Sequence, residues 1–307
     1  MDNLGFTLTP DSMGHFRDAR LPMVVLGILG LVGAGLYPVF LRFFIWALSK
    51  LKWPNSGQES LAYLLKHSRR CSMLLFPAGT THALLAINAA LNIIDTLLIV
   101  ILDRDSSQVA GLSLGQRLAA AFFQAAASRH AGMTPYDLAK VSPAVQFSLL
   151  VMMYVSVLPI ALSIRTPNPS YEEQPVAIFA PETRYYDETR SGLYLLQHLR
   201  RQLSRDLWFI FLAIFCLSVS EARKLKDESD AAFQLFPLFF EVVSAYNNVG
   251  ISLGAGPGIY SALSTRFSMA GKLVICACMI RGRHRSMPQR LDGAIMLPGE
   301  REDEAEK

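Results

Sequence analysis

Three glycines stand in closely matched surroundings, and the chemistry that they suggest is that of the peptide backbone. The motifs read NLGFT, HAGMT and NVGIS, each with a polar residue, an apolar residue, glycine, an apolar residue and then Ser or Thr. Glycine accepts positive φ and lets the backbone approach an ion closely. A ring of backbone carbonyls can replace the hydration shell of a monovalent cation such as potassium. The motifs therefore predict ion-binding filter positions at the glycines and at the residues before them: Gly5, Gly132 and Gly250, with the neighbours Leu4, Ala131 and Val249.

The alternative for each glycine is that it does no more than end a helix, because glycine is common just after a helix C-terminus. For any one of the three motifs taken alone, this is the better interpretation. Three matching contexts favour the ion-binding interpretation instead, since two of them follow apolar segments that are too short to cross a membrane.

Other motifs indicate no enzyme, cofactor or resident metal. The run GAGPG at Gly254–Gly258 lacks the Lys-Ser/Thr of a phosphate-binding loop. The six histidines form no ligand pair, and the four cysteines show no CxxC or Cys/His spacing. We therefore expect no catalysis, no cofactor and no resident metal.

The composition indicates a membrane protein. Of the 307 residues, 51% are hydrophobic and 18% are charged, whereas soluble domains are usually nearer a quarter charged. About 20 apolar residues cross the hydrocarbon core of a bilayer. Five segments approach or reach this length and are predicted spans: Leu21–Leu41, Cys71–Ile94, Pro143–Ile164, Leu207–Ser220 and Phe267–Ile280.

Two shorter apolar segments, Leu118–Ala127 and Phe233–Ala245, are predicted to be re-entrant helices. The connections after the first, third and fifth spans are rich in Lys and Arg, which places them in the cytoplasm by the positive-inside rule. Five spans satisfy that rule only if both short segments enter and leave on the outer face. The net charge of +4 is explained by these loops, so no nucleic-acid partner is expected.

The order span, re-entrant helix, glycine loop, span occurs twice, and an incomplete third copy opens the chain. The glycines lie 127 and 118 residues apart, a length typical of supersecondary units arrayed around an axis. Lys272 lies nine residues before Arg281, about 13 Å inside the last span at ~1.5 Å per residue. Such a depth predicts a basic residue facing an ion pathway; a lysine that reaches the interface or pairs with a carboxylate is the alternative.

Three polar residues, Asn88, Asn92 and Asp95, lie on one face of the second predicted span. Their spacing of four and three residues is that of helical neighbours. We expect them to hold helices together rather than to bind ions, because such groups commonly hydrogen-bond across bundles.

Several runs resemble the fungal Trk-type potassium transporters, among them NLGFTLTPDSM, QLSRDLWFIFLAIF, FEVVSAYNNVGISLG and IRGRHRSMPQRLDGAIMLP. The resemblance extends from the first residues to about Pro298. It implies an all-α integral membrane fold in which four span–pore-loop–span repeats surround a pseudo-fourfold ion pathway. By resemblance, Gly5, Gly132 and Gly250 match the filter positions of the second, third and fourth repeats, and Lys272 matches the basic residue of the last helix.

The resemblance also implies potassium uptake across the plasma membrane, with the basic loops and the C-terminus in the cytoplasm. Such transporters usually dimerise, so a homodimer is expected beside potassium ions and the lipid bilayer as partners. About two and a half of the four repeats are present, which predicts a truncated gene model or fragment; a non-transporting membrane scaffold or pseudo-subunit is the alternative. The expected divisions are the end of the second repeat at 1–52, a cytoplasmic loop at 53–70, the third repeat at 71–165, a cytoplasmic loop at 166–206, the fourth repeat at 207–285 and a cytoplasmic tail at 286–307.

Overall fold

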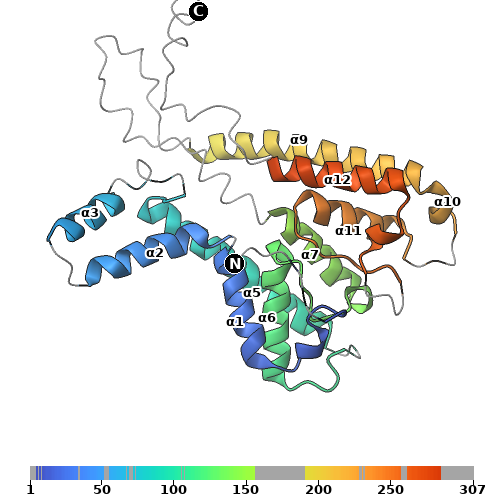
Figure 1. The fold of residues 1–307 in the computed structure, drawn as a ribbon, viewed down its shortest axis with the longest axis horizontal. Helices are drawn as coiled ribbons and strands as arrows, with labels where there is room; N and C mark the ends of the chain where they lie inside the picture. The colour runs from blue at the N-terminus through green and yellow to red at the C-terminus, as the bar shows by residue number, and fades with distance from the viewer. Residues whose placement is uncertain are drawn as a thin grey trace, which may run out of the picture.

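The computed structural model describes residues 5, 7, 9–33, 35–51, 55–66, 68, 72, 74–104, 106, 108–155, 191–227, 230, 232–256 and 261–284. Within these residues every regular element is a helix, as predicted. Figure 1 shows their arrangement. The helices are α1 (Arg20–Gly33), α2 (Tyr37–Lys50), α3 (Asn55–Lys66), α5 (Ala78–Leu102), α6 (Leu114–His130), α7 (Pro143–Val155), α9 (Ser191–Ser220), α10 (Ala222–Leu225), α11 (Leu235–Tyr246) and α12 (Met269–His284), with short 3-10 helices η1 (Gly14–Phe16), η2 (Leu138–Lys140) and η5 (Leu263–Arg266).

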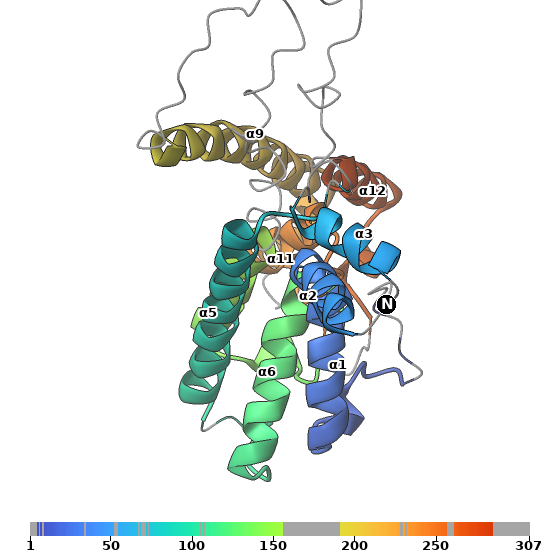
Figure 2. The same cartoon turned by 90° about the vertical axis from the view of Figure 1, so that its left-hand side faces the viewer.

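The helices form two packed groups joined by α7. In the first group α6 lies between α1 and α5, as Figure 2 shows. In the second, α9 and α12 lie side by side, and α11 packs against both (Figure 1). Helix α7 contacts α5 and α6 on one side and α11 on the other. The two short helices α6 and α11 therefore occupy the middle of the molecule.

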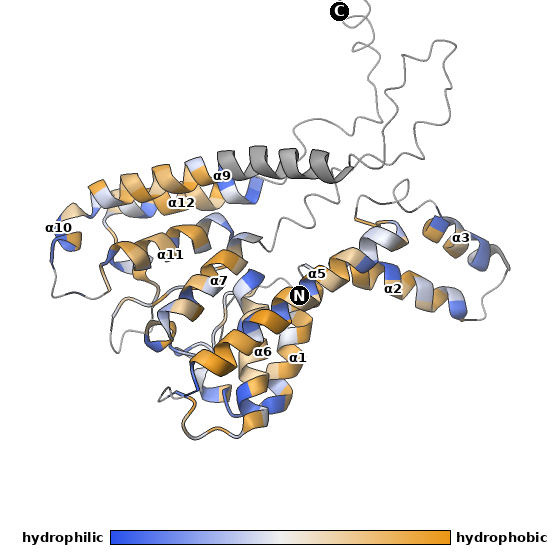
Figure 3. Cartoon of the chain, turned by 180° about the vertical axis from the view of Figure 1, so that it is seen from behind, coloured by the Kyte–Doolittle hydropathy of each residue, from blue (hydrophilic) through white to orange (hydrophobic). Residues whose placement is uncertain are grey.

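The interior is apolar, and so is much of the exterior. The largest buried cluster joins α7, α9, α11 and α12 around Phe240 and Leu217. On the outside, Trp208 and Phe215 of α9 are each 66% exposed. Figure 3 shows apolar colour along α12 and α5 and polar colour over much of α3. Large exposed apolar surfaces are typical of faces that meet lipid or another protein segment.

Among the described helices, only α5 is long and apolar enough to cross a bilayer by itself. Helices α1 and α2 would together make a second span, although they are bent by 93° at the break between them. Shorter apolar helices cover Pro143–Tyr154, Asp206–Ser220 and Leu235–Tyr246.

The prediction of one continuous helix over Leu21–Leu41 is wrong. Helix α1 ends at Gly33, and α2 starts at Tyr37 with Pro38 in its first turn. Proline is tolerated there because the first amides of a helix have no intrahelical acceptor. Gly35 allows a close approach at the break, since a Cβ on it would lie 3.2 Å from Asn88 Oδ1. A search for charge-free windows does not detect such a bend.

Two other span boundaries are also wrong. Helix α5 covers Ala78–Leu102 rather than Cys71–Ile94, because Pro77 is its N-cap and the buried Asp95 does not interrupt it. Helix α9 begins at Ser191, so it runs unbroken from the predicted cytoplasmic loop into the span expected at Leu207. Glu221, which directly follows α9, is 2% exposed. Its side chain accepts a hydrogen bond from the Ser268 amide (2.6 Å).

The last span and the two short helices lie close to their predicted positions. Helix α12 starts at Met269 instead of Phe267 and continues to His284. Helix α11 agrees within two residues, and α6 starts four residues early because Ser113 and Gln116 form a capping box. The predicted end of the third span at Ile164 and the tail at 286–307 lie outside the described residues. Entry and exit of α6 and α11 on one membrane face stays a prediction.

Candidate ion-binding site

The three predicted filter glycines share one backbone conformation. Their φ angles are 73° at Gly5, 67° at Gly132 and 87° at Gly250. This left-handed region costs a residue with a side chain about 1–2 kcal/mol, whereas glycine enters it freely. The three positions therefore require glycine for the path of the chain alone.

The same three glycines meet in space, although more than a hundred residues separate each from the next. A Cβ on Gly132 would lie 2.8 Å from the Val249 carbonyl oxygen and 3.4 Å from Gly5 Cα. A Cβ on Gly5 would lie 3.1 Å from the Ala131 carbonyl oxygen. The carbonyls of two predicted neighbours thus lie within this glycine cluster, while Leu4 lies outside the described residues.

The asparagines after α11 explain how an apolar pore helix can end beside the cluster. Asn247 is 5% exposed and its side-chain amide donates to the Val243 carbonyl (2.8 Å). Asn248 takes a φ of 54°, and the next amide, that of Val249, donates back to Ser244 (3.0 Å). Asparagine is among the few residues that enter this region readily. The two asparagines therefore end the helix and turn the chain toward Gly250.

The loop that follows Gly5 is joined directly to the loop that follows Gly132. The Met13 amide donates to the Thr134 carbonyl (3.1 Å), and the Thr134 amide donates to the Ser12 hydroxyl (3.0 Å). Ser12 itself has a φ of 59°. These hydrogen bonds, made by residues that follow Gly5 and Gly132 in the chain, thus support the convergence of the two glycines.

The polar stripe of α5 lies behind this site and holds neighbouring helices, as predicted. Asn88 Oδ1 accepts from Arg129 Nη1 of α6 (2.7 Å), and Asp95 Oδ1 accepts from Ser148 Oγ of α7 (2.7 Å). Asn92 instead donates to the Asn88 carbonyl of its own helix (2.9 Å). Sequence reasoning missed Arg129, which is 3% exposed and stands three residues before Gly132. An arginine directly after the apolar run Leu118–Ala127 and three residues before a motif glycine was the available signal.

Lys272 lies apart from the buried core. It is exposed in the first turn of α12, next to Gly271, and its amide donates to the Ser268 carbonyl (2.9 Å). The structure thus places it near the start of the helix. That its ammonium group faces the ion pathway stays a prediction.

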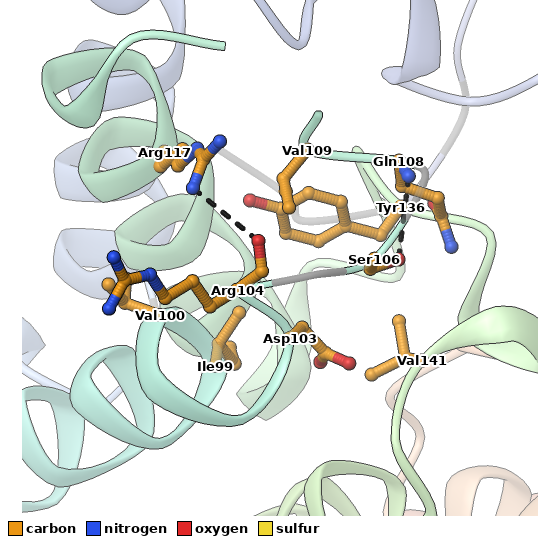
Figure 4. A pocket seen from close by; sticks show the side chains of 10 residues that line it. All are labelled: Ile99, Val100, Asp103, Arg104, Ser106, Gln108, Val109, Arg117, Tyr136 and Val141. Carbon is orange, nitrogen blue, oxygen red and sulfur yellow. Dashed lines mark hydrogen bonds between the residues drawn. The ribbon is translucent and has the colours of Figure 1, made fainter. Parts of the chain in front are cut away.

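The two cavities described in the structure lie away from the glycine cluster. One, of about 20 Å³, is enclosed where α5 meets the loop before α6, with Asp103, Arg117 and Tyr136 in its wall (Figure 4). That is room for about one water molecule. The other, of about 330 Å³, is apolar and lies between α5 and the α1–α2 bend, lined partly by Leu36 and Phe122. The candidate site is thus built from backbone and not from a ligand pocket.

Comparison with known proteins identifies the family. The family model named TrkH and described as a cation transport protein matches residues 1–304. The chain belongs to the TrkH family. It is 43% identical to a potassium transporter of Candida albicans, 39% to the low-affinity potassium transport protein of Saccharomyces cerevisiae and 41% to potassium transport protein 1 of Schizosaccharomyces pombe.

These alignments cover 97%, 99% and 98% of this Trk chain but 28%, 38% and 35% of the three relatives. The chain therefore spans about a third of the length of the proteins that it matches. The comparisons confirm the predicted resemblance to fungal Trk transporters. They also confirm the all-helical membrane fold class.

Proposed function

We propose that this Trk chain contributes three of four filter loops to a potassium uptake pathway. In this proposal the backbone carbonyls around Gly5, Gly132 and Gly250, including those of Leu4, Ala131 and Val249, replace the water around a potassium ion. Inward movement of the cation is driven by the membrane potential, worth about 2.3 kcal/mol per charge per 100 mV. Lys272 acts in the pathway as a positive charge that limits ion occupancy.

One observation carries the proposal: the three motif glycines share a left-handed backbone, and Gly132 lies against the other two. A helix-ending glycine needs the conformation but has no reason to meet two others from distant segments. The identity to named potassium transporters supports potassium as the ion. We further propose a multi-pass plasma-membrane protein that functions as a homodimer, with its basic loops in the cytoplasm by the positive-inside rule.

The fourth loop is proposed to come from protein sequence outside this chain. The relatives are about three times as long, and the three loops are in van der Waals contact rather than spread around an ion. A fourth member would complete the ring and hold the loops apart. This makes the chain the C-terminal part of a longer transporter.

Growth of a potassium-uptake-deficient yeast on low potassium tests the proposal. We expect rescue by a version extended upstream of Met1 and no rescue by the 307-residue chain. Rescue by neither form, with both at the plasma membrane, would favour the non-transporting scaffold.

A second test uses Gly250→Arg in the extended protein. A guanidinium at this position brings a fixed positive charge and a side chain into the proposed filter, so uptake should be abolished while membrane insertion persists. Surface labelling measures insertion, and rubidium uptake measures transport. Unchanged uptake would remove Gly250 from the filter.

A further inference from the structure

Each filter motif ends in Ser or Thr two residues after its glycine, and these hydroxyls make related contacts. Thr7 Oγ1 donates to the Thr9 carbonyl (2.9 Å), and Thr134 Oγ1 accepts from the Tyr136 amide (3.2 Å). In the last motif Ser252 Oγ accepts from the Gly254 amide (3.1 Å). In all three loops, therefore, the hydroxyl holds the backbone two residues further on and fixes the exit from the motif.

One of these hydroxyls is also bonded directly by a buried side chain of the preceding helix, and another is linked to such a side chain through η5. In the third motif Thr134 Oγ1 lies 2.7 Å from the side-chain amide oxygen of Gln124, which belongs to α6 and is 1% exposed. Gln124 therefore connects the helix that precedes the glycine to the segment that follows it.

At the Gly250 motif the corresponding residue is Glu241 of α11, which acts through η5. Glu241 is 6% exposed, and its Oε1 accepts from the Ser264 amide at the start of η5 (3.1 Å). The adjacent Leu263 amide donates to Ser252 Oγ (3.0 Å), so Glu241 and Ser252 accept from neighbouring amides of η5. Helix α11 and the segment after Gly250 are thus both hydrogen-bonded to η5, at the neighbouring residues Leu263 and Ser264.

We propose that Gln124 and Glu241 are positioning residues for ion selectivity. Each holds the backbone segment after its motif glycine at a fixed distance from the pathway, through the Ser or Thr of the motif. The proposal rests on the proposed function. Neither side chain touches the ion; each acts through Thr134 or Ser252. A buried polar group that loses its partner is costly, so the correct strand position is favoured over displaced ones.

The test measures the preference for potassium over sodium in the extended protein, expressed in the deficient yeast and corrected for surface amount. Gln124→Leu and Glu241→Leu should each lower the preference by roughly tenfold, the factor expected from losing about 1.4 kcal/mol of hydrogen bonding. Glu241→Gln should retain most of it, because its amide oxygen still accepts from Ser264. Gln146→Leu is the matched control: Gln146 is 8% exposed and bonds the Leu138 and Val141 carbonyls, away from the glycines. It should leave the preference unchanged.

Thr134→Val and Ser252→Ala give a second reading if a leucine variant does not reach the membrane. These small changes remove only the hydroxyl, and each should also lower the preference. Unchanged preference in both, with transport intact, would overturn the proposal but not the transport function. If Gln146→Leu lowered the preference as much as Gln124→Leu and Glu241→Leu, the proposal would also be overturned. Absence of uptake by the unmutated extended protein would instead overturn the proposed function itself.

Discussion

At Gly132 the backbone conformation and the surrounding space both exclude a side chain. Gly250 has the same conformation, but its Cβ would meet nothing closer than Gly132 Cα at 3.7 Å. The two glycines therefore differ in space and not in torsion. This difference gives each position its own expected sensitivity to substitution.

Gly132→Ala should reduce potassium uptake more than Gly250→Ala. In both variants the left-handed alanine costs about 1–2 kcal/mol. Only in Gly132→Ala does the added Cβ also lie 2.8 Å from a backbone oxygen. Gly254→Ala is the control, because its φ is 92° and a Cβ there meets nothing within 4 Å. Uptake normalised to surface protein measures the effect. Equal losses in all three variants would show that torsion alone sets it.

Asn88→Leu should destabilise the protein by about 1–3 kcal/mol, because it leaves a buried guanidinium without its acceptor. Arg129 Nε and Nη2 already have no hydrogen-bond partner among the described residues. Asn92→Leu is the matched control, since that side chain donates only within α5 and should cost less. Thermal unfolding in detergent measures both. A larger loss in Asn92→Leu would contradict the assigned role of Asn88.

The last turn of α12 packs closely against the end of α11, the helix that leads to Gly250. A Cβ on Gly282 would lie 1.7 Å from the Tyr246 carbonyl oxygen at the C-terminus of α11. The Asn248 side chain donates to the Met279 carbonyl of α12 (3.3 Å). Glycine at this position therefore lets α12 pack directly on the end of the helix that leads to Gly250.

Gly282→Ala should separate α12 from α11 and lower uptake at equal surface amount. The control is Gly79→Ala in the first turn of α5, where a Cβ meets nothing within 4 Å and should cause no loss. Uptake and thermal unfolding are measured for both variants. Full activity of Gly282→Ala would mean that the helices shift without affecting the filter.

The loops before and after α11 are joined by Arg266, whose Nη1 donates to the Ala255 carbonyl (2.6 Å) and whose Nη2 donates to Asp230. The hydrogen bond from Arg266 is the main cause that lowers the pKa of Asp230 below its ordinary 3.8. A lowered pKa means that this stabilisation is complete above about pH 4 and is lost as the pH falls through the folded value.

We therefore expect the thermal stability of the detergent-solubilised protein to fall below about pH 4. Asp230→Asn should reduce that fall and leave stability between pH 6 and 8 nearly unchanged, since an exposed pair contributes little. Melting curves from pH 3 to 8 make the comparison. An identical acid dependence in both proteins would exclude Asp230 as a contributor.

Element types were predictable from the sequence, but several boundaries were not. The short helices α6 and α11 lie close to their predicted ranges because polar caps and glycines flank their apolar residues. The bend at Gly33–Tyr37 and the start of α5 were missed, since they depend on Pro38, Pro77 and the contact of Asn88 with Gly35. A search for charge-free segments responds only to the hydropathy of the sequence. Tertiary contacts do not change that hydropathy, so the search cannot detect them.

At the scale of the whole molecule, the matched motifs were enough to predict which glycines come together. What they did not predict is the hydrogen bonding that supports them, because Arg129 and Gln124 occupy positions that no repeat of the motif marks. The exposed side chains of Trp208 and Phe215 show that the described helices present apolar faces outward. These faces are suited to lipid and to further transporter segments.

The contacts of Gly132 with Gly5 and with the Gly250 loop have a consequence for the order of synthesis. Chains are made at about 5–20 residues per second, so Gly250 leaves the ribosome on the order of tens of seconds after Gly5. Until then Gly132 cannot meet the Gly250 loop, so the proposed ion site is completed only after α11 has been made.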